Sequence, residues 1–423
     1  MDRTYDAVIY GASGFTGAYI VRALASSKSA AGKKIAVAGR NESKLRKTLL
    51  DVSDDIGVNV RDWPILIADS SDVESLAAMA RRATVIINAV GPYRLYGEEV
   101  VRAAVENGAH HVDISGEPTF LESMQLKYSE LAREKGVYVV GACGFDSIPC
   151  DMGVHFLKRN FDGSLGYAET YFVGLPGPSG YAINSGTYET LMLAIANKAR
   201  DGLGKLRRAI MPDKPKTAKP PKRNLLFSVD EPSLEGRALP FAGSDKSVVN
   251  RSQYYDFHAN KKIPVAVETY FTVSSFFSGV LLMAWMAVMA ILCQFQPTLR
   301  FVINNPDLMS FGKFRKAGPT KQQIKEMKFS YYVFGRGWEG EVEDVPGTEP
   351  TKIAAAVCRG PDPGYVATAG CVAASALTIL NDKANLPKNG GVYTTGSAFG
   401  NSRLIEVLKE FDITFELLYG GKK

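Results

Sequence analysis

Short apolar runs alternate with segments of helical periodicity through the first 150 residues. The opening run is YDAVIYG, and further strands are predicted at 35–38, 85–89 and 137–140. Strands that alternate with helices are typical of a parallel sheet with crossover helices. The pattern therefore predicts an α/β fold whose first domain, residues 1–150, is a Rossmann-like doubly wound parallel sheet.

This alternation stops near residue 151. The runs AETYFVG and AVETYFTVSS are predicted strands of a different sheet, so a second α+β domain for substrate binding or dimerisation is expected over 151–365. The later run GYVATAGCVAASALTIL predicts a helix of small residues that packs closely and has a structural role.

The second domain carries an apolar, membrane-type segment at 270–297. Its centre, FFSGVLLMAWMAVMAILC, has no charge, and eighteen helical residues measure roughly 27 Å, close to a hydrocarbon core of about 30 Å. Three interpretations stay open: a shallow monotopic insertion, a helix buried in the core or in an oligomer interface, and a spanning helix. Basic runs on both sides favour a membrane surface.

One basic run, 198–223, holds ten Lys or Arg against two Asp. It is either a solvated, partly mobile loop or a patch for anionic lipid head groups. It has no interleaved aromatic residues, so nucleic acid is not expected as a partner.

The first turn has the composition of a dinucleotide site. In GASGFTG, Gly11, Gly14 and Gly17 allow a sharp turn and a close approach of the backbone to a pyrophosphate, and the helix that follows points amides at the phosphates. The neighbouring side chains in this site are Ser13, Phe15 and Thr16. A tight turn without a ligand is the alternative.

The end of the second strand selects the cofactor. NAD enzymes usually place an acid there, whereas this chain has Arg40, Asn41 and, one turn on, Lys44. Cations suit a 2′-phosphate, so NADP(H) is predicted, unless these cations are merely solvated. Asp69 ends the third strand, where an adenine contact is common.

Later strands end in further site candidates. Parallel strands bind ligands beyond their carboxyl ends. The cofactor-contacting candidates there are Val90, Gly91, Pro92, Ser115 and Gly116. Tyr93 and Asp146 follow the fourth and sixth strands and are the predicted catalytic residues. Alternatively, Tyr93 shapes the pocket and Asp146 caps a helix.

Composition excludes several other classes. Hydrophobic residues make up 46% of 423 residues and charged residues 22%, as in a globular protein, and the net charge is a mild +6. The five Cys have no metal-ligand spacing, so we expect reduced thiols and no metal site. The first residues do not read as a secretory signal.

Several of these motifs resemble one family. The runs GASGFTG, AGRNESKL, NAVGPYRLYGEEVV, DISGEP, GFDSIPCDMG, FAGSDKSVV and GPDPGYVATAG are similar to the animal saccharopine dehydrogenase-like oxidoreductases, which are related to the trans-acting enoyl reductases. The resemblance implies an NADP-binding Rossmann domain, an inserted second domain and a carboxyl-terminal part, 366–423, that returns to the Rossmann domain. It also implies a lipid-droplet or mitochondrial location. One departure is Ser147-Ile148, where saccharopine reductases have Pro-Gly.

Together these features predict an NADPH-dependent oxidoreductase at a cytosol-facing membrane or lipid-droplet surface, with a homodimer as a possible state. It would reduce a double bond or a carbonyl of a lipophilic substrate. Two alternatives remain: an NADP-binding scaffold protein with little catalysis, and a soluble amino-acid oxidoreductase of the saccharopine type.

Overall fold

The computed structural model describes residues 3–422 and divides into two compact units. The first unit ends at residue 148 and resumes over 363–414, and the second covers 149–362 and the chain from 415 onward. The chain after residue 362 therefore contributes to both units. Its helices lie in the first unit, whereas the last strand, β16 (Thr414–Tyr419), pairs in the sheet of the second unit.

A seven-stranded parallel sheet forms the first unit, in the order β15-β6-β5-β4-β1-β2-β3. Its strands are β1 (Tyr5–Tyr10), β2 (Ile35–Gly39), β3 (Ile65–Ile67), β4 (Ala83–Asn88), β5 (His110–Asp113), β6 (Tyr138–Val140) and β15 (Gly391–Tyr393). β1 pairs in parallel with β2 on one side and with β4 on the other. Its side chains are buried almost throughout, as in a sheet covered on both faces. The predicted doubly wound sheet is confirmed.

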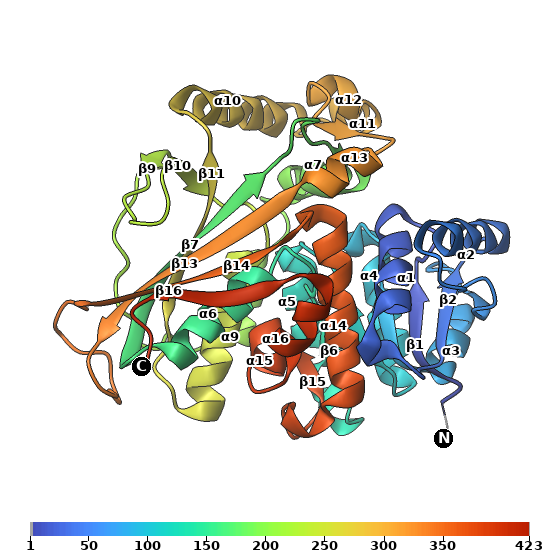
Figure 1. The fold of residues 1–423 in the computed structure, drawn as a ribbon, viewed down its shortest axis with the longest axis horizontal. Coiled ribbons are helices and arrows are strands. Elements are labelled where there is room, and N and C mark those ends of the chain that lie inside the picture. Colours follow the sequence, from blue (N-terminus) through green and yellow to red (C-terminus); the bar gives the residue numbers. More distant parts are fainter. Residues whose placement is uncertain (1–2, 423) are drawn as a thin grey trace. The chain divides into compact units, whose positions relative to one another are not determined.

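Helices connect these strands (Figure 1). They are α1 (Phe15–Ser26), α2 (Glu42–Ile56), α3 (Val73–Arg82), α4 (Tyr93–Glu106), α5 (Pro118–Glu134), α14 (Thr368–Asn381), α15 (Thr395–Phe399) and α16 (Leu404–Leu408). α14 is the predicted small-residue helix, and it packs against α1, β4 and β5. With the π-helical turn before it, 363–381 is long and apolar enough to cross a membrane by length and composition alone. Because 78% of its most apolar stretch of 18 residues is buried, we interpret it as the core helix of this unit.

The second unit is built on another seven-stranded sheet, ordered β16-β14-β13-β7-β11-β10-β9. Its other strands are β7 (Ser164–Leu175), β9 (Phe227–Ser228), β10 (Arg237–Pro240), β11 (Ala266–Val273), β13 (Lys328–Trp338) and β14 (Lys352–Pro361). β7 pairs in parallel with β11 and antiparallel with β13, so the sheet is mixed. The two predicted strand runs are β7 and β11, which lie side by side in this second sheet.

Helices and one small ribbon complete the second unit. They are α6 (Ile148–Asn160), α7 (Ser185–Asn197), α8 (Leu203–Ile210), α9 (Asp245–Asn260), α10 (Phe276–Leu292), α11 (Gln296–Asn304), α12 (Pro306–Met309) and α13 (Lys321–Glu326), with the paired strands β8 (Ile183–Asn184) and β12 (Phe314–Arg315). α10 is the predicted apolar helix. It lies beside α11 and α12 at the edge of its unit (Figure 1).

The basic segment 198–223 is attached to the second sheet at its carboxyl end. The Arg223 guanidinium donates two hydrogen bonds, of 3.0 and 2.7 Å, to the carboxylate of Glu169 on β7. The Lys216 ammonium donates to the Val345 carbonyl at 2.7 Å, and Ala218 is buried. The rest of the segment is mostly exposed, so both the solvated loop and the lipid patch remain compatible with the structure.

Candidate cofactor and active site

The glycine-rich turn between β1 and α1 is built around close backbone contacts. Gly11 has φ +88°, and a Cβ there would lie 2.7 Å from the Val90 side chain. A Cβ on Gly17 would lie only 2.2 Å from the Gly11 carbonyl oxygen, so α1 can approach the turn only because this residue has no side chain. Gly14 is exposed, and a Cβ at this position would meet only the Gly11 oxygen, at 3.2 Å. The turn is compact inside and open toward solvent.

The amino end of α1 is suited to an anion. Gly14 is its N-cap residue, and no side chain caps the helix. Ser13 is exposed, while Phe15 and Thr16 are partly exposed beside it. Unpaired amides and the positive end of the helix dipole bind phosphate well. The exposed glycine and the uncapped helix therefore fit the pyrophosphate of a dinucleotide.

Cations stand at the end of β2. Arg40 and Lys44 are both exposed, directly after the strand and in the first turn of α2. The Asn41 side-chain oxygen caps α2, accepting from the Lys44 amide at 3.0 Å and from the Ser43 hydroxyl at 2.8 Å. Asn41 thus fixes the strand–helix corner that presents the two cations. This arrangement fits the 2′-phosphate of NADP(H).

Asp69 lies in the turn after β3. Its carboxylate accepts from the amide and the hydroxyl of Ser71, at 2.9 and 2.8 Å. These bonds, with a smaller contribution from Arg40, lower the pKa of Asp69. β2 pairs in parallel with β3, with Gly39 opposite Ile67, so the polar residues that follow the two strands lie at the same edge of the sheet.

The loop after β4 closes over the glycine turn. It runs Val90-Gly91-Pro92 with a cis Gly91–Pro92 bond, and the Val90 amide donates to the Asn88 side chain at 3.0 Å. The contact of Val90 with Gly11 brings two of the predicted cofactor segments together.

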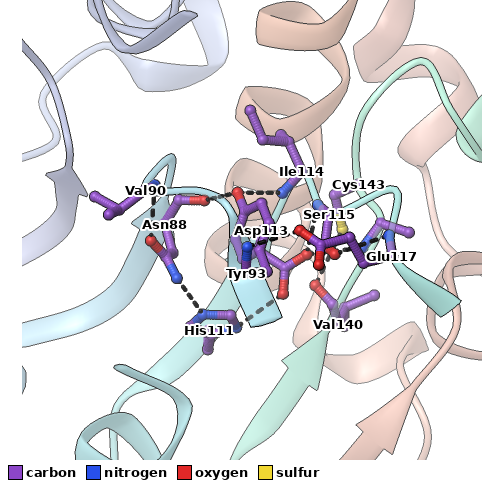
Figure 2. Close-up of polar contacts among 11 residues, drawn as sticks. Asn88, Val90, Tyr93, His111, Asp113, Ile114, Ser115, Glu117, Val140 and Cys143 are labelled. Carbon is purple, nitrogen blue, oxygen red and sulfur yellow. Dashed lines mark hydrogen bonds and ion pairs between the residues drawn. The ribbon is translucent and has the colours of Figure 1, made fainter. Parts of the chain in front are cut away.

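Tyr93 is buried beside this loop. Its hydroxyl donates to the Asn88 carbonyl at 2.8 Å and accepts from the Ile114 amide at 3.3 Å (Figure 2). Burial, followed by the charge of Asp113, raises its pKa well above the ordinary value. In this geometry Tyr93 joins the ends of β4 and β5, as the pocket-shaping alternative requires. A proton-donor role would need the hydroxyl to leave the Asn88 carbonyl.

Glu117 holds the start of α4. Its buried carboxylate accepts from the Tyr93 amide at 2.7 Å, from the Arg94 amide at 3.1 Å and from the Arg94 guanidinium at 3.2 Å. The amino end of α4 is therefore neutralised by the protein itself, in contrast to the open end of α1. Of these two helix ends, that of α1 is the better suited to an anionic ligand.

Asp113 joins β5 to the loop after β6. One carboxylate oxygen accepts from the amides of Ser115 and Ala142, at 2.9 and 3.0 Å, and the Asp113 carbonyl accepts from the Cys143 amide at 2.7 Å. His111 Nδ1 lies 3.7 Å from the other oxygen. Burial lowers the pKa of His111 to about 3, so the ring is neutral at pH 7. Figure 2 shows these contacts beside the loop residues.

Asp146 lies at the same edge of the sheet. A Cβ on Gly116 would lie 2.6 Å from an Asp146 carboxylate oxygen, so this carboxylate rests against the loop after β5. Asp146 is partly exposed and stands two residues before α6. Ser115 in the same loop is buried, and its hydroxyl oxygen accepts from the Glu117 amide at 3.2 Å. Asp146 is thus the predicted catalytic residue that retains access to solvent.

Sequence reasoning missed the residues that hold this edge together, namely Asn88, Asp113 and Glu117 in its role as a helix anchor. Asn88 is the polar end of a buried apolar strand, and Asp113 is the acidic end of the buried strand HHVD; these positions are the signal that could have pointed to both residues. Within residues 3–422 no group of three or more His, Cys, Asp or Glu side chains could hold a metal ion. The geometry of the α1 turn fits a dinucleotide, and the Asp146 carboxylate lies at the same edge of the sheet.

Comparisons with known proteins agree with this geometry. Residues 7–140 match the family model described as the saccharopine dehydrogenase NADP binding domain. The chain is 51% identical to the "Lipid droplet localized protein" of Caenorhabditis elegans, and 38% identical to the "Saccharopine dehydrogenase-like oxidoreductase" of Pongo abelii, covering 98% of both chains in each case.

Two weaker likenesses complete the comparison. The solved apo saccharopine dehydrogenase (L-Glu forming) of Saccharomyces cerevisiae has a similar fold, with a TM-score of 0.53 at 13% identity, over 98% of this chain and 100% of that one. The expected relation to the trans-acting enoyl reductases is confirmed for part of the chain, at 41% identity over 158 residues of the Mycobacterium bovis protein.

Proposed function

The chain belongs to the saccharopine dehydrogenase-like oxidoreductase family and is an NADP-dependent oxidoreductase by that membership; from this premise we propose that it reduces an activated double bond or a carbonyl of a lipophilic substrate. We place the reaction at the cytosol-facing surface of a lipid droplet or an intracellular membrane, with a mitochondrial location as the alternative. The observation that carries the proposal is that one unit has both the uncapped end of α1 and two exposed cations, Arg40 and Lys44, while the other unit exposes the uncharged helix α10.

The cofactor would be held by the first unit. The α1 amides and the exposed Ser13–Gly14 backbone would bind the pyrophosphate, and Arg40 and Lys44 would pair with the 2′-phosphate. Asp69 would face the adenosine, and the loop from Val90 to Pro92 would lie along the dinucleotide beyond Gly11. When bound, NADPH supplies the hydride.

We assign the side chains at the sheet edge two different tasks. Tyr93 positions the loop after β4, because its hydroxyl already bonds the Asn88 carbonyl and the Ile114 amide. Asp146 orients the substrate or delivers the proton at the reduced atom, because it is partly exposed and rests against Gly116. Ser115 and Gly116 shape the wall between them.

A second candidate function is an NADPH-binding scaffold with little turnover. The engaged hydroxyl of Tyr93 favours it, since the tyrosine expected to donate a proton is buried in the sheet edge. NADPH binding without oxidation of the cofactor by any substrate would identify this function.

The cofactor part of the proposal has a direct test. Arg40→Ala should weaken NADPH binding about 10–150-fold, which corresponds to the loss of one charge-assisted contact of about 1.5–3 kcal/mol, and should leave NADH binding unchanged. Lys47→Ala is the matched control, because Lys47 lies one turn further along α2 and pairs with Asp51. Fluorescence titration of both reduced cofactors measures the six affinities of the wild type and the two variants. Equal losses for NADPH and NADH would overturn the assignment of Arg40.

A further inference from the structure

α10, α11 and the turn after α12 lie next to one another in the second unit and expose large apolar side chains at its surface. We propose that this surface docks side-on onto an anionic phospholipid layer, with α10 lying in the plane of the head groups. The inference rests on the lipid-surface location proposed above but not on the proposed reaction. The exposed side chains of α10, α11 and the 308–311 turn form what we call the apolar face.

α10 has two different sides. Phe277, Leu281, Val288 and Ile291 recur at spacings of three, four or seven residues, so they lie on one side of the helix, and each is at least 50% exposed. On the opposite side, Met289 and Cys293 are buried in a cluster with α7 and α11. The helix is therefore fixed to the protein along one side and bare along the other.

The apolar face continues beyond α10. Phe295 before α11, Phe301 on α11 and Leu308 on α12 are each more than half exposed. The Trp285 indole donates to the Met309 carbonyl at 2.7 Å and ties α10 to α12. The three helices are thus joined to one another, and each exposes large apolar side chains. An exposed apolar surface of this extent is typical of an interaction site.

Phe311 is the most exposed of these side chains, at 87%. Its φ is +52°, a conformation that a bulky residue adopts at a cost, so the fold holds the ring outward against its backbone preference. The turn is firmly bonded: the Gly312 amide donates to the Asp307 carbonyl at 2.7 Å, and the Phe314 amide to the Ser310 hydroxyl at 2.8 Å. A rigid turn that presents an aromatic ring to solvent is suited to insertion between lipid head groups.

The charges around the apolar face favour an anionic surface. Between residues 274 and 316 the chain has four cations, Arg300, Lys313, Arg315 and Lys316, and one acid, Asp307. All four cations are exposed, and three of them follow Phe311 within five residues. The Asp307 carboxylate accepts from the Lys316 amide, so the acid is used inside the turn. Cations beside exposed aromatic and aliphatic groups are complementary to acidic lipid head groups.

A second copy of this chain is the main rival occupant. The spacing of the exposed α10 residues also resembles a coiled-coil seam, which normally has charged residues along its flanks. No charge occurs between Thr269 and Leu299, so this seam lacks the flanking charges that coiled-coil pairing normally uses.

A helix that spans the membrane does not fit either. α10 is packed on the protein along one side, and both β11 before it and α11 after it belong to the same unit.

Flotation of the full chain with liposomes tests the proposal. We would compare vesicles of phosphatidylcholine and phosphatidylserine (about 7:3) with phosphatidylcholine alone. The wild type should float with the mixed vesicles, and Ile291→Ser/Phe311→Ser should lower the bound fraction at least tenfold, because two inserted side chains are lost. The matched control is Leu50→Ser/Leu126→Ser, which changes two exposed leucines of the first unit and should float like the wild type.

Two further measurements separate the outcomes. NADPH titration should give the same affinity for all three proteins, so a failure to float with intact cofactor binding would overturn the docking surface without touching the proposed reaction. Light scattering reports the oligomeric state. If the wild type does not float and is a dimer that Ile291→Ser/Phe311→Ser converts to a monomer, the occupant is a second copy and the lipid assignment is wrong. Equal flotation with both vesicle types would overturn the role of the cations.

Discussion

Two glycines in the same turn should respond to alanine in opposite ways. In Gly17→Ala the new Cβ would lie 2.2 Å from the Gly11 carbonyl oxygen and 2.8 Å from the Ala12 Cα. Because Cβ contacts below 3.0 Å are essentially not observed, α1 must move by nearly the whole 0.8 Å difference from the shorter contact. A third backbone atom, the Ala12 carbonyl carbon, would lie at 2.9 Å. Overpacking of this kind costs about 1–3 kcal/mol, and the three backbone contacts place it at the upper end.

Gly14→Ala is the matched comparison. Its Cβ would meet only the Gly11 oxygen at 3.2 Å, and its φ of −76° is ordinary for any residue. We expect its free energy of unfolding to change by less than about 1 kcal/mol, the scale of an N-cap preference. The Cβ would instead stand where the pyrophosphate approaches, so NADPH affinity should fall at least tenfold.

Urea unfolding and fluorescence titration of NADPH measure both quantities on both variants. The expected pattern is loss of stability in Gly17→Ala and loss of affinity with normal stability in Gly14→Ala. A Gly17→Ala variant as stable as the wild type would refute the packing argument. A Gly14→Ala variant that binds NADPH normally would show that the cofactor does not approach this turn.

Two further predictions follow from the buried groups of the first unit. Glu117→Gln should lower the free energy of unfolding by about 2 kcal/mol, because the start of α4 loses a charged acceptor. The control is Glu98→Gln, which removes an exposed ion pair with Lys127 and should change the free energy of unfolding by less than about 0.5 kcal/mol. Equal thermal shifts for the two variants would contradict the role of Glu117 as the anchor of α4. Burial lowers the pKa of His110 to about 4 and of His111 to about 3, so the folded chain keeps both rings neutral while the unfolded chain takes up protons below about pH 6.5. The free energy of unfolding should therefore be highest above that pH and fall toward pH 4, with a loss of about 2 kcal/mol per ring at pH 5. A urea midpoint that is unchanged between pH 7.5 and pH 5 would refute this prediction.

The sequence predicted those parts of the fold that depend on local pattern. Buried strands, glycine at the first turn and a cation after β2 are each visible in a few consecutive residues. The anchors Asn88 and Glu117 were not predictable in their roles, because these depend on backbone amides that the folded loops and helices bring to the side chains. Tyr93 was placed correctly after β4, but the direction of its hydroxyl depends on the packing of β5 beside it.

The apolar helix shows a second limit. Polar and apolar positions normally reveal which side of a helix is buried, but α10 has no charged residue, so its composition does not distinguish the two sides. The structure distinguishes them through Met289 and Cys293, whose burial depends on α7, some hundred residues earlier in the chain. The basic segment was equally ambiguous, because the pairing of Arg223 with Glu169 on β7 depends on the folded sheet.

The most direct test of the central claim follows the hydride itself. We would incubate the protein with NADPH deuterated at C4 of the nicotinamide, and add in parallel a cellular lipid extract and an aqueous metabolite extract. Mass spectrometry would then locate the label. We expect a lipid product that carries one deuterium, formed by the wild type and strongly reduced for Gly14→Ala. Deuterium in an amino acid and not in any lipid would contradict the account, and no transfer to either extract would leave a protein that binds NADPH without using it.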